Sequence, residues 1–440
     1  MSDISNGHSY SSTLKNWTTV GILLFLYVLS LLDRQILPLL AISVQRDLHL
    51  SDFQLGALQG LAFALFYASA GLMMGWAIDR YSRRLVIFFG VLFWSVSCSS
   101  GGLASSFGAL FLSRLGVGLG EAALTPGAFS IFRDIFPPKR LATAIGVFTT
   151  GAGFGYGVSY VFGSRIISLL SAPPTFIAPL MTHFRLWQAA FILAGLPGAL
   201  LAFSILLIPE PPRRQSVMAT DTMMAPVMAC FRKHPILLPC HMFGFAFAFM
   251  YFGAVTVWTP VYLARHFGWT PVAIGNSLAV CFGVMLAIGS LTTGLVADRL
   301  FAAGVRDIFF RAMIGVLIIG ILAIVGAFSA SSPQVFLVLL SIFGFTIGTA
   351  GPLAGTSLQL IAPSGLGGRL TAVYLFLQNL IGLGCGPLMV GAVTDHVLHD
   401  PARVGTSIAI TASFAGIVSL LLLALAMAPF RAAIAYLRPG

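Results

Sequence analysis

Four ionisable residues interrupt apolar stretches in the first half of the sequence. Asp33 and Arg34 share one stretch, and Arg114 and Glu121 share another. Each such residue costs roughly 2.5–3.5 kcal/mol at the centre of a membrane-spanning helix, so the four need partners or a polar cavity. Burial in a poorly hydrated cavity raises the proton affinity of a carboxyl group, and a neighbouring arginine lowers it. We therefore expect Glu121, the deepest of the four, and then Asp33, to carry protons, and Arg34 and Arg114 to bind an anionic group.

Helix geometry predicts that these four side chains meet. If the first stretch runs outward from residue 17 and the second inward from residue 109, a rise of about 1.5 Å per residue places Asp33 and Arg114 at similar depths. Glu121 lies two turns beyond Arg114 on the same face, near the middle of a bilayer core of roughly 30 Å. Arg34 points about 100° away from Asp33 and reaches either Glu121 or Arg114. The alternative is a static salt-bridge network that only locks the two helices together.

The second half has almost no charge inside its apolar stretches. Its candidate substrate-binding residues are Asn379 and Tyr251, the latter within the aromatic segment FGFAFAFMYFG of residues 243–253. An interhelical hydrogen bond for Asn379 and a lipid-facing role for the aromatic segment are the alternatives. A charged first half opposite an apolar second half suits a substrate with an ionic head and an apolar tail.

The composition excludes a soluble protein and predicts the elements that position these residues. Hydrophobic residues make up 58% and charged residues 8% of the 440 residues, and the mean hydropathy is +0.95, whereas soluble proteins hold about 25% charged residues. Apolar runs predict twelve transmembrane helices, at about 17–40, 54–78, 85–105, 109–131, 141–169, 187–208, 236–263, 272–297, 308–329, 334–361, 370–393 and 405–429. Glycines in the fifth run predict close helix packing.

The predicted fold class is an all-α membrane protein with two pseudo-symmetric six-helix bundles. We expect the bundles at residues 16–208 and 236–430, a cytoplasmic linker at 209–235, and cytoplasmic tails at 1–15 and 431–440. The proline-rich start of the linker prevents a continuous helix. Its second part, residues 222–233, either lies along the membrane surface or is a flexible connection.

The net charge of +11 reflects membrane topology rather than nucleic-acid binding. With both termini in the cytoplasm, 17 of the 24 lysines and arginines fall in inner segments and five in outer segments. This bias predicts a plasma-membrane protein, in a bacterium the inner membrane, with both termini cytoplasmic. We expect it to function as a monomer, with membrane lipids and a small-molecule or lipid-like substrate as its partners.

One motif occurs in both halves, each time after the second predicted helix. Residues 75–84 read GWAIDRYSRR, and a shortened copy follows in the second half. We expect these loops to form a latch at the inner face that is made and broken between conformations. The latch residues are Gly75, Asp79, Arg80, Arg83, Arg84, Gly294, Asp298 and Arg299.

This repeated loop resembles the G-x-x-x-D-R signature of the major facilitator superfamily. The Asp33–Arg34 pair, the segment RLGVGLGEA at 114–122 and the segment RLWQAAFILAGLPG at 185–198 resemble the Spinster branch of that family. The resemblance implies that Asp33, Arg34, Arg114 and Glu121 line a central cavity and take part in proton-linked transport. Spinster proteins of animals move sphingosine phosphate and lysophospholipids.

We therefore expect a proton-coupled secondary active transporter that works by alternating access on an amphiphilic or anionic small molecule, such as a lysolipid or sphingolipid-like compound. One alternative is an importer of small organic anions, such as a carboxylate or sugar acid, by proton symport. Another is an integral-membrane lipid enzyme. The sequence has no G-x-x-x-x-G-K-[ST], H-E-x-x-H or G-x-S-x-G motif, so we expect no enzyme activity, no metal and no cofactor beyond the proton gradient.

Overall fold

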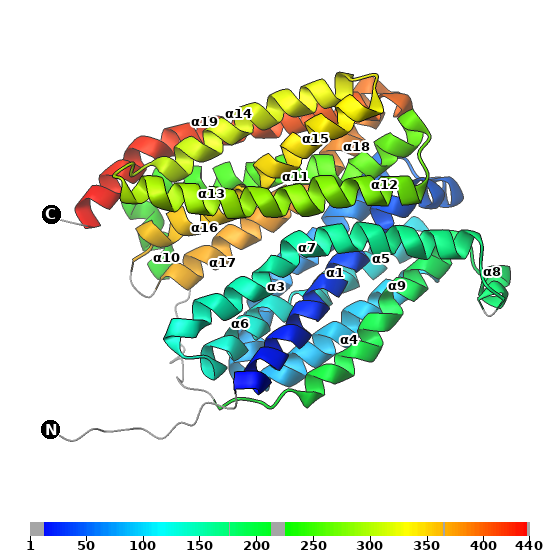
Figure 1. Ribbon diagram of the computed structural model, residues 1–440, viewed down its shortest axis with the longest axis horizontal. Helices are drawn as coiled ribbons and strands as arrows, with labels where there is room; N and C mark the ends of the chain where they lie inside the picture. The colour runs from blue at the N-terminus through cyan, green and yellow to red at the C-terminus, as the bar shows by residue number, and fades with distance from the viewer. Residues whose placement is uncertain (1–12, 176, 213–224, 364–365, 438–440) are drawn as a thin grey trace.

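The computed structural model describes residues 13–175, 177–212, 225–363 and 366–437. Residues 1–12 and 438–440 of the predicted tails and residues 213–224 of the predicted linker, which include the first part of its possible surface segment, therefore lie outside the described residues. Within the described ranges, every regular element is a helix (Figure 1). The helix α10 (Ala225–Lys233) covers the second part of that surface segment.

Twelve membrane-spanning segments contain nearly all of the helical residues. In the first half they are α1 (Thr13–Leu48), α2–η1–α3 (Asp52–Gly56, Ala57–Leu61, Ala62–Arg80), α4 (Arg83–Gly101), α5–α6 (Phe107–Glu121, Leu124–Ile135), α7 (Pro138–Ser171) and α9–η2 (Leu186–Ala202, Phe203–Leu207). In the second half they are α11 (Leu237–Phe267), α12–η3–α13 (Pro271–Leu278, Ala279–Val284, Met285–Ala302), α14 (Ile308–Ser329), α15–α16 (Pro333–Gly348, Ala350–Ile361), α17–η4–α18–η5 (Gly367–Leu377, Gln378–Cys385, Gly386–Ala392, Val393–Leu398) and α19 (Val404–Leu437).

Length and composition support this count. Among the described residues, eleven of these segments are long and apolar enough to cross a membrane, and the 34-residue α7 completes the set of twelve. The predicted all-α membrane fold is therefore confirmed. The short helices α8 (Ala178–His183) and η6 (Pro401–Arg403) lie in the loops.

Polar caps mark where several spans begin. The side chains of Ser51, Ser82, Ser106 and Thr270 accept hydrogen bonds from backbone N–H groups in the first turns of α2, α4, α5 and α12. Such caps satisfy N–H groups that have no partner within the helix. They therefore fix the positions at which these helices enter the bundles.

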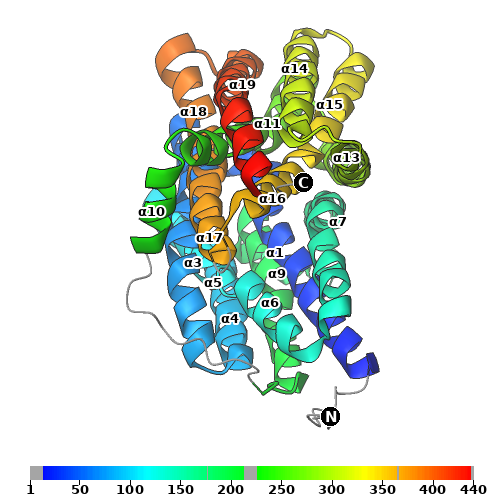
Figure 2. The same cartoon turned by 90° about the vertical axis from the view of Figure 1, so that its left-hand side faces the viewer.

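The helices form two bundles that pack side by side (Figure 1). In the first bundle α1 packs on α7, and α4 packs on α5 and α9, while in the second α11 packs on α19 and α14 packs on α15 and α19. Two seams join the bundles: α7 packs against α12 and η3, and the segment α2–η1–α3 packs against η4 and α18. We call the end where α1 begins and α19 ends the terminal face, which Figure 2 views, and the opposite end the distal face.

Small residues let the helix backbones touch at these seams. A Cβ atom on Gly283 of η3 would lie 2.6 Å from Gly157 Cα of α7, and one on Gly60 of η1 would lie 2.7 Å from the carbonyl oxygen of Gly384 in η4. The packing role predicted for the glycines of the fifth span agrees with this geometry. Sequence patterns did not predict the π-helical segments η1, η3 and η4, which interrupt three spans at the seams.

Candidate functional site

The central feature of the first bundle is an ion pair between α1 and α5. Arg34 Nε donates a hydrogen bond to Glu121 Oε2 at 2.7 Å, and Arg34 Nη2 contacts the same oxygen. The Arg34 guanidinium also stacks over the rings of Phe63, 4.2 Å from its centroid, and Tyr67, 4.9 Å from its centroid. Of the two partners expected for Arg34, the structure therefore selects Glu121. The Glu121 side chain is 1% exposed and that of Arg34 16% exposed, so Arg34 separates the carboxylate from the solvent side.

Asp33 and Arg114 also lie next to each other, but through a different contact from the one we expected. Arg114 Nη1 donates a hydrogen bond to the backbone carbonyl oxygen of Asp33 at 3.0 Å, and the described residues contain no salt bridge between the two side chains. The Asp33 carboxyl group instead lies beside Cys98 and Trp94 of α4. Three buried polar atoms of this cluster have no hydrogen-bond partner: Asp33 Oδ1, Arg114 Nε and Glu121 Oε1. The two carboxyl oxygens can therefore each accept a proton or a hydrogen bond, and Arg114 Nε can donate one.

Glycines in α5 let the helix that carries Arg114 and Glu121 pack closely on α3 and α4. A Cβ atom on Gly118 would lie 2.3 Å from the carbonyl oxygen of Phe63 in α3, and one on Gly120 would lie 2.6 Å from that of Gly90 in α4. Side chains at these positions would hold α5 away from both helices. The segment RLGVGLGEA therefore combines two charged residues with the small residues that let their helix pack closely.

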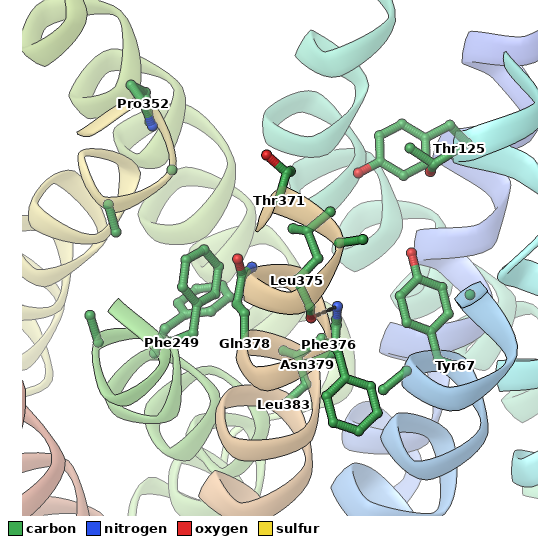
Figure 3. Close-up of a pocket in the computed structure, with 18 of the residues that line it drawn as sticks. Tyr67, Thr125, Phe249, Pro352, Thr371, Leu375, Phe376, Gln378, Asn379 and Leu383 are labelled. Atoms are coloured by element: carbon green, nitrogen blue, oxygen red, sulfur yellow. Dashed lines mark hydrogen bonds between the residues drawn. The ribbon is translucent and has the colours of Figure 1, made fainter. Parts of the chain in front are cut away.

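A cavity of about 720 Å³ lies between the two bundles. Its first-bundle wall includes Arg34 with three tyrosines from α1, α3 and α7, which are Tyr27, Tyr67 and Tyr156. Its second-bundle wall is largely apolar, with Phe249, Phe252, Leu375 and Phe376 and the amides of Gln378 and Asn379. Figure 3 shows Tyr67 across the pocket from Phe376 and Asn379.

Among the charged residues predicted to line the cavity, only Arg34 is in its lining. Asp33, Arg114 and Glu121 are at most 2% exposed and lie behind the wall, because the close packing of α5 covers them. Asn379 does line the cavity, and its Nδ2 donates to the Leu375 carbonyl oxygen at 2.7 Å. Tyr251 lies elsewhere: it is 1% exposed and packs edge-on against Phe343, away from the cavity lining.

Sequence reasoning missed the three tyrosines around Arg34. A signal for one of them was present, because Tyr27 lies seven residues before Arg34 and therefore on the same face of α1. Tyr67 and Tyr156 come from other helices, so no spacing within one segment identifies them.

The cavity extends from Arg34 toward the terminal face. There its lining reaches Gln359 and Gly368, which lie near the terminal-face ends of α16 and α17. Toward the distal face the backbones of the two bundles touch: a Cβ atom on Gly56 would lie 2.4 Å from the carbonyl oxygen of Pro387. The structure is therefore closed at the distal face.

The predicted latch residues lie at the terminal face, but they form two different groups. Asp79, Arg80, Asp298 and Arg299 are exposed, and the described residues contain no ion pair to either aspartate. Gly75 and Gly294 face open space. Arg83 is 1% exposed and forms ion pairs inside the first bundle, with Asp134 and Glu210, and Arg84 bonds to the carbonyl oxygen of Ile208. These last two arginines therefore tie the start of α4 to the end of the same bundle.

Glu210 anchors the chain after η2 to the start of α4. It accepts hydrogen bonds from Ser82 Oγ at 2.6 Å, Arg83 Nε at 2.9 Å and the backbone N–H of Arg84 at 3.0 Å. Partial burial alone would raise the pKa of this carboxyl group, but these donors outweigh it and hold the pKa below its usual value. Glu210 is therefore ionised and acts as a remote cap on α4.

The site combines a buried ion pair with a cavity between the two bundles. The described residues contain no group of three or more histidines, cysteines or acids close enough to hold a metal ion. A buried ion pair beside a cavity at the junction of two helical bundles is instead typical of secondary transporters.

Comparison with known proteins identifies the family. The family model described as Major Facilitator Superfamily matches residues 23–387, so the chain belongs to this family of membrane transporters and is not an enzyme. It is 26% identical over 390 residues to an MFS-type efflux pump of Mycolicibacterium smegmatis, covering 87% of this chain and 86% of the relative. It is also 26% identical over 412 residues to a probable L-galactonate transporter of Escherichia coli, covering 88% and 85%.

The predicted likeness to Spinster proteins is also confirmed. The fold matches the crystal structure of a bacterial homologue of the human lysosomal transporter Spinster in an inward-facing and unoccupied conformation. That match has a TM-score of 0.80 and 23% identity, and it covers 98% of this chain and 100% of the other. Spinster proteins of animals are among the sequence relatives as well.

Proposed function

We propose that this transporter is proton-coupled and carries an anionic amphiphile, such as a lysolipid, by alternating access. The observation that carries the proposal is the position of Arg34, which faces the cavity while its guanidinium is bound to the buried Glu121. An arginine is the side chain best suited to hold a phosphate or carboxylate head. The apolar second-bundle wall opposite it, with Phe249 and Phe252, suits a hydrocarbon tail.

Competition for Arg34 couples the substrate to the proton. An anionic head and the Glu121 carboxylate cannot both be neutralised by one guanidinium. When Glu121 takes a proton, Arg34 is free to bind the head, so the proton and the anion favour each other's binding. This coupling is reciprocal, and it makes proton–anion symport the expected mode. Asp33, with its unpartnered Oδ1, is the second proton acceptor, and Arg114 holds the Asp33 backbone in place.

The second candidate is symport of a hydroxylated organic acid. The hydroxyl groups of Tyr27, Tyr67 and Tyr156 surround the cavity wall that carries Arg34, and hydroxyl groups suit a sugar acid as well as a phosphate head. The relative named as a probable L-galactonate transporter supports this candidate, while the Spinster homologues support the first. In both cases we propose that the terminal face lies in the cytoplasm and that the protein works as a monomer in the plasma membrane; the positive-inside distribution supports this orientation.

Two glycines in the cavity wall allow a test of whether the transported substrate occupies this cavity. Cβ atoms on Gly71 of α3 and Gly351 of α16 would meet no atom within 4 Å, and both residues line the cavity. A leucine at position 351 therefore fills cavity space without forcing the helices apart. Gly315→Leu, at an open position outside the lining, is the matched control.

The assay measures uptake of lysophosphatidylglycerol and of D-galactonate by proteoliposomes, with and without an imposed pH gradient. For an amphiphile carrier we expect gradient-driven uptake of the lysolipid that Gly351→Leu lowers by about tenfold and Gly315→Leu leaves unchanged. Gradient-driven uptake of D-galactonate alone would select the second candidate. Uptake of either compound that ignores the pH gradient would overturn the proton coupling.

A further inference from the structure

An ion pair with a fully buried acid joins the two bundles at the distal face. The side chain of Asp52, at the start of α2, is 0% exposed. Arg265, near the end of α11, binds it with both ends of its guanidinium: Nη1 donates to Oδ2 at 2.9 Å and Nη2 donates to Oδ1 at 2.6 Å. Gln45 of α1 completes the set, because its Nε2 donates to Asp52 Oδ1 and its Oε1 accepts from Arg265 Nη2, both at 2.6 Å. We call Gln45, Asp52 and Arg265 the distal lock.

The distal lock lies within a tightly packed seam. Next to it, the backbone N–H of Phe53 donates to Asp395 Oδ2 at 2.6 Å, and Arg265 Nη1 also donates to the Pro401 carbonyl oxygen at 3.0 Å. A Cβ atom on Gly391 of α18 would lie 2.3 Å from the carbonyl oxygen of Asp52. The two backbones are thus in direct contact, and the lock is the charged centre of this contact.

The geometry points to a conformational role for this pair, and the inference rests on the alternating access proposed above. We propose that the distal lock holds the cavity closed at the distal face and must separate for the cavity to open there. Asp52 is fixed on a helix whose start is capped by Ser51, so it cannot follow Arg265 when the bundles part. Opening the seam exposes both charges to water, which compensates for the lost ion pair.

Removing one partner should therefore favour the open state. In Arg265→Gln, Asp52 would remain as a buried charge without its cation, and opening the seam is the way to hydrate it. In the double variant Asp52→Asn with Arg265→Gln, no charge is left, and the two amides can bond to each other and to Gln45. The double variant should then return toward the closed state, which loss of folding would not do.

A steric change tests the same seam independently of charge. Gly56→Ala places a Cβ atom 2.4 Å from the Pro387 carbonyl oxygen, so α2 and α18 must separate to accommodate it. Gly315→Ala, where a Cβ atom meets nothing within 4 Å, is the matched control.

The readout is the distance between spin labels on the two bundles at the distal face. Leu103, just after α4, and Val335, in the first turn of α15, are exposed and can be replaced by cysteines in a background without the native ones. Electron–electron resonance on the purified full-length chain then reports the fractions of closed and open molecules.

We expect the parent and Gly315→Ala to show the short distance of the closed seam. Arg265→Gln and Gly56→Ala should each raise the open fraction at least severalfold, and the double variant should lower it again. If Arg265→Gln and Gly56→Ala are folded and keep the parent distance, the proposed lock does not hold the seam. If Arg265→Gln fails to fold, Asp52→Asn, which removes the other charge of the lock, takes its place, and a folded Asp52→Asn protein that keeps the parent distance overturns the proposed lock. Because the readout is structural, it is independent of whether transport requires a pH gradient.

Discussion

Glu121→Gln is the change that tests the coupling between proton and substrate most directly. Glutamine has nearly the same shape as glutamate but carries no charge, so it mimics the protonated state and cannot compete with an anion for Arg34. A hydrogen bond between charged partners is worth about 1.5–3 kcal/mol, and about 1.4 kcal/mol corresponds to a factor of ten. Loss of the charged hydrogen bond from Arg34 Nε to Glu121 Oε2, at 2.7 Å, therefore predicts roughly ten- to hundredfold tighter anion binding in the variant.

The assay compares binding and transport in the same preparation. Binding of D-galactonate and of lysophosphatidylglycerol is measured by calorimetry over a range of pH, and uptake is measured in proteoliposomes. For the parent we expect affinity for the transported compound to fall as the pH rises, and for Glu121→Gln we expect a high affinity that does not change with pH. The variant should still exchange substrate but should lose accumulation driven by a pH gradient.

One result would refute this reasoning. If Glu121→Gln accumulates substrate from a pH gradient as well as the parent does, Glu121 is not the proton carrier. Glu210→Gln is the control, because it makes the same exchange at an acid outside the membrane-spanning segments. This control should retain gradient-driven accumulation, so a loss in both variants would indicate a general defect.

The other predictions concern folding of the first bundle, measured as thermal unfolding in detergent. Arg83→Gln should lower the unfolding free energy by about 3–5 kcal/mol because it removes the closest cation from the buried Asp134 carboxylate, whereas Arg80→Gln, at an exposed position, should change it by less than about 0.5 kcal/mol. Gly118→Ala should cost about 1–3 kcal/mol and reduce transport by pushing α5 from α3, whereas Gly108→Ala in the same helix faces open space and should be neutral. Because the pKa of Glu210 is lowered in the folded state, its contribution is present above its ordinary value of 4.5 and is lost as the pH falls through the folded pKa. The difference in melting temperature between the parent and Glu210→Gln should therefore shrink as the pH is lowered below about 4.5; a difference that grows there would contradict this assignment.

Much of the fold was predictable because its signals are local. Each span is an apolar run bounded by polar residues, and the structure places α14 at Ile308–Ser329, as the sequence predicted. The Arg34–Glu121 pair was predictable as one of two options, because only a few charges occur inside the apolar runs. Where the helices change character was not predictable: α5 ends at Glu121 and α6 starts at Leu124, within one continuous apolar run.

The contacts that escaped prediction depend on tertiary packing. Asp52 and Arg265 are 213 residues apart and lie at the ends of helices, where charged residues are common and carry no signal of their partner. The Arg114 contact to a backbone oxygen of Asp33 was missed for another reason. Charge pairing predicts side chains as partners, whereas a buried guanidinium also bonds to carbonyl oxygens that happen to be in reach.

The Arg34–Glu121 pair and the distal lock share one structural element, α1. Arg34, which binds Glu121, and Gln45, which bonds to both charges of the distal lock, are 11 residues apart in this helix, or about three turns, and so lie on the same side of it. Under the proposed coupling, a proton on Glu121 would release α1 from α5 at the level of the cavity, while the proposed distal lock would hold the far end of α1 to the second bundle. Pro38 lies in α1 between the two contacts, where a missing backbone hydrogen bond lets a helix bend. We infer that the proton site and the distal seam both act on α1. When the Arg34–Glu121 contact is released, only the contact of Gln45 with the distal lock resists a tilt of this helix.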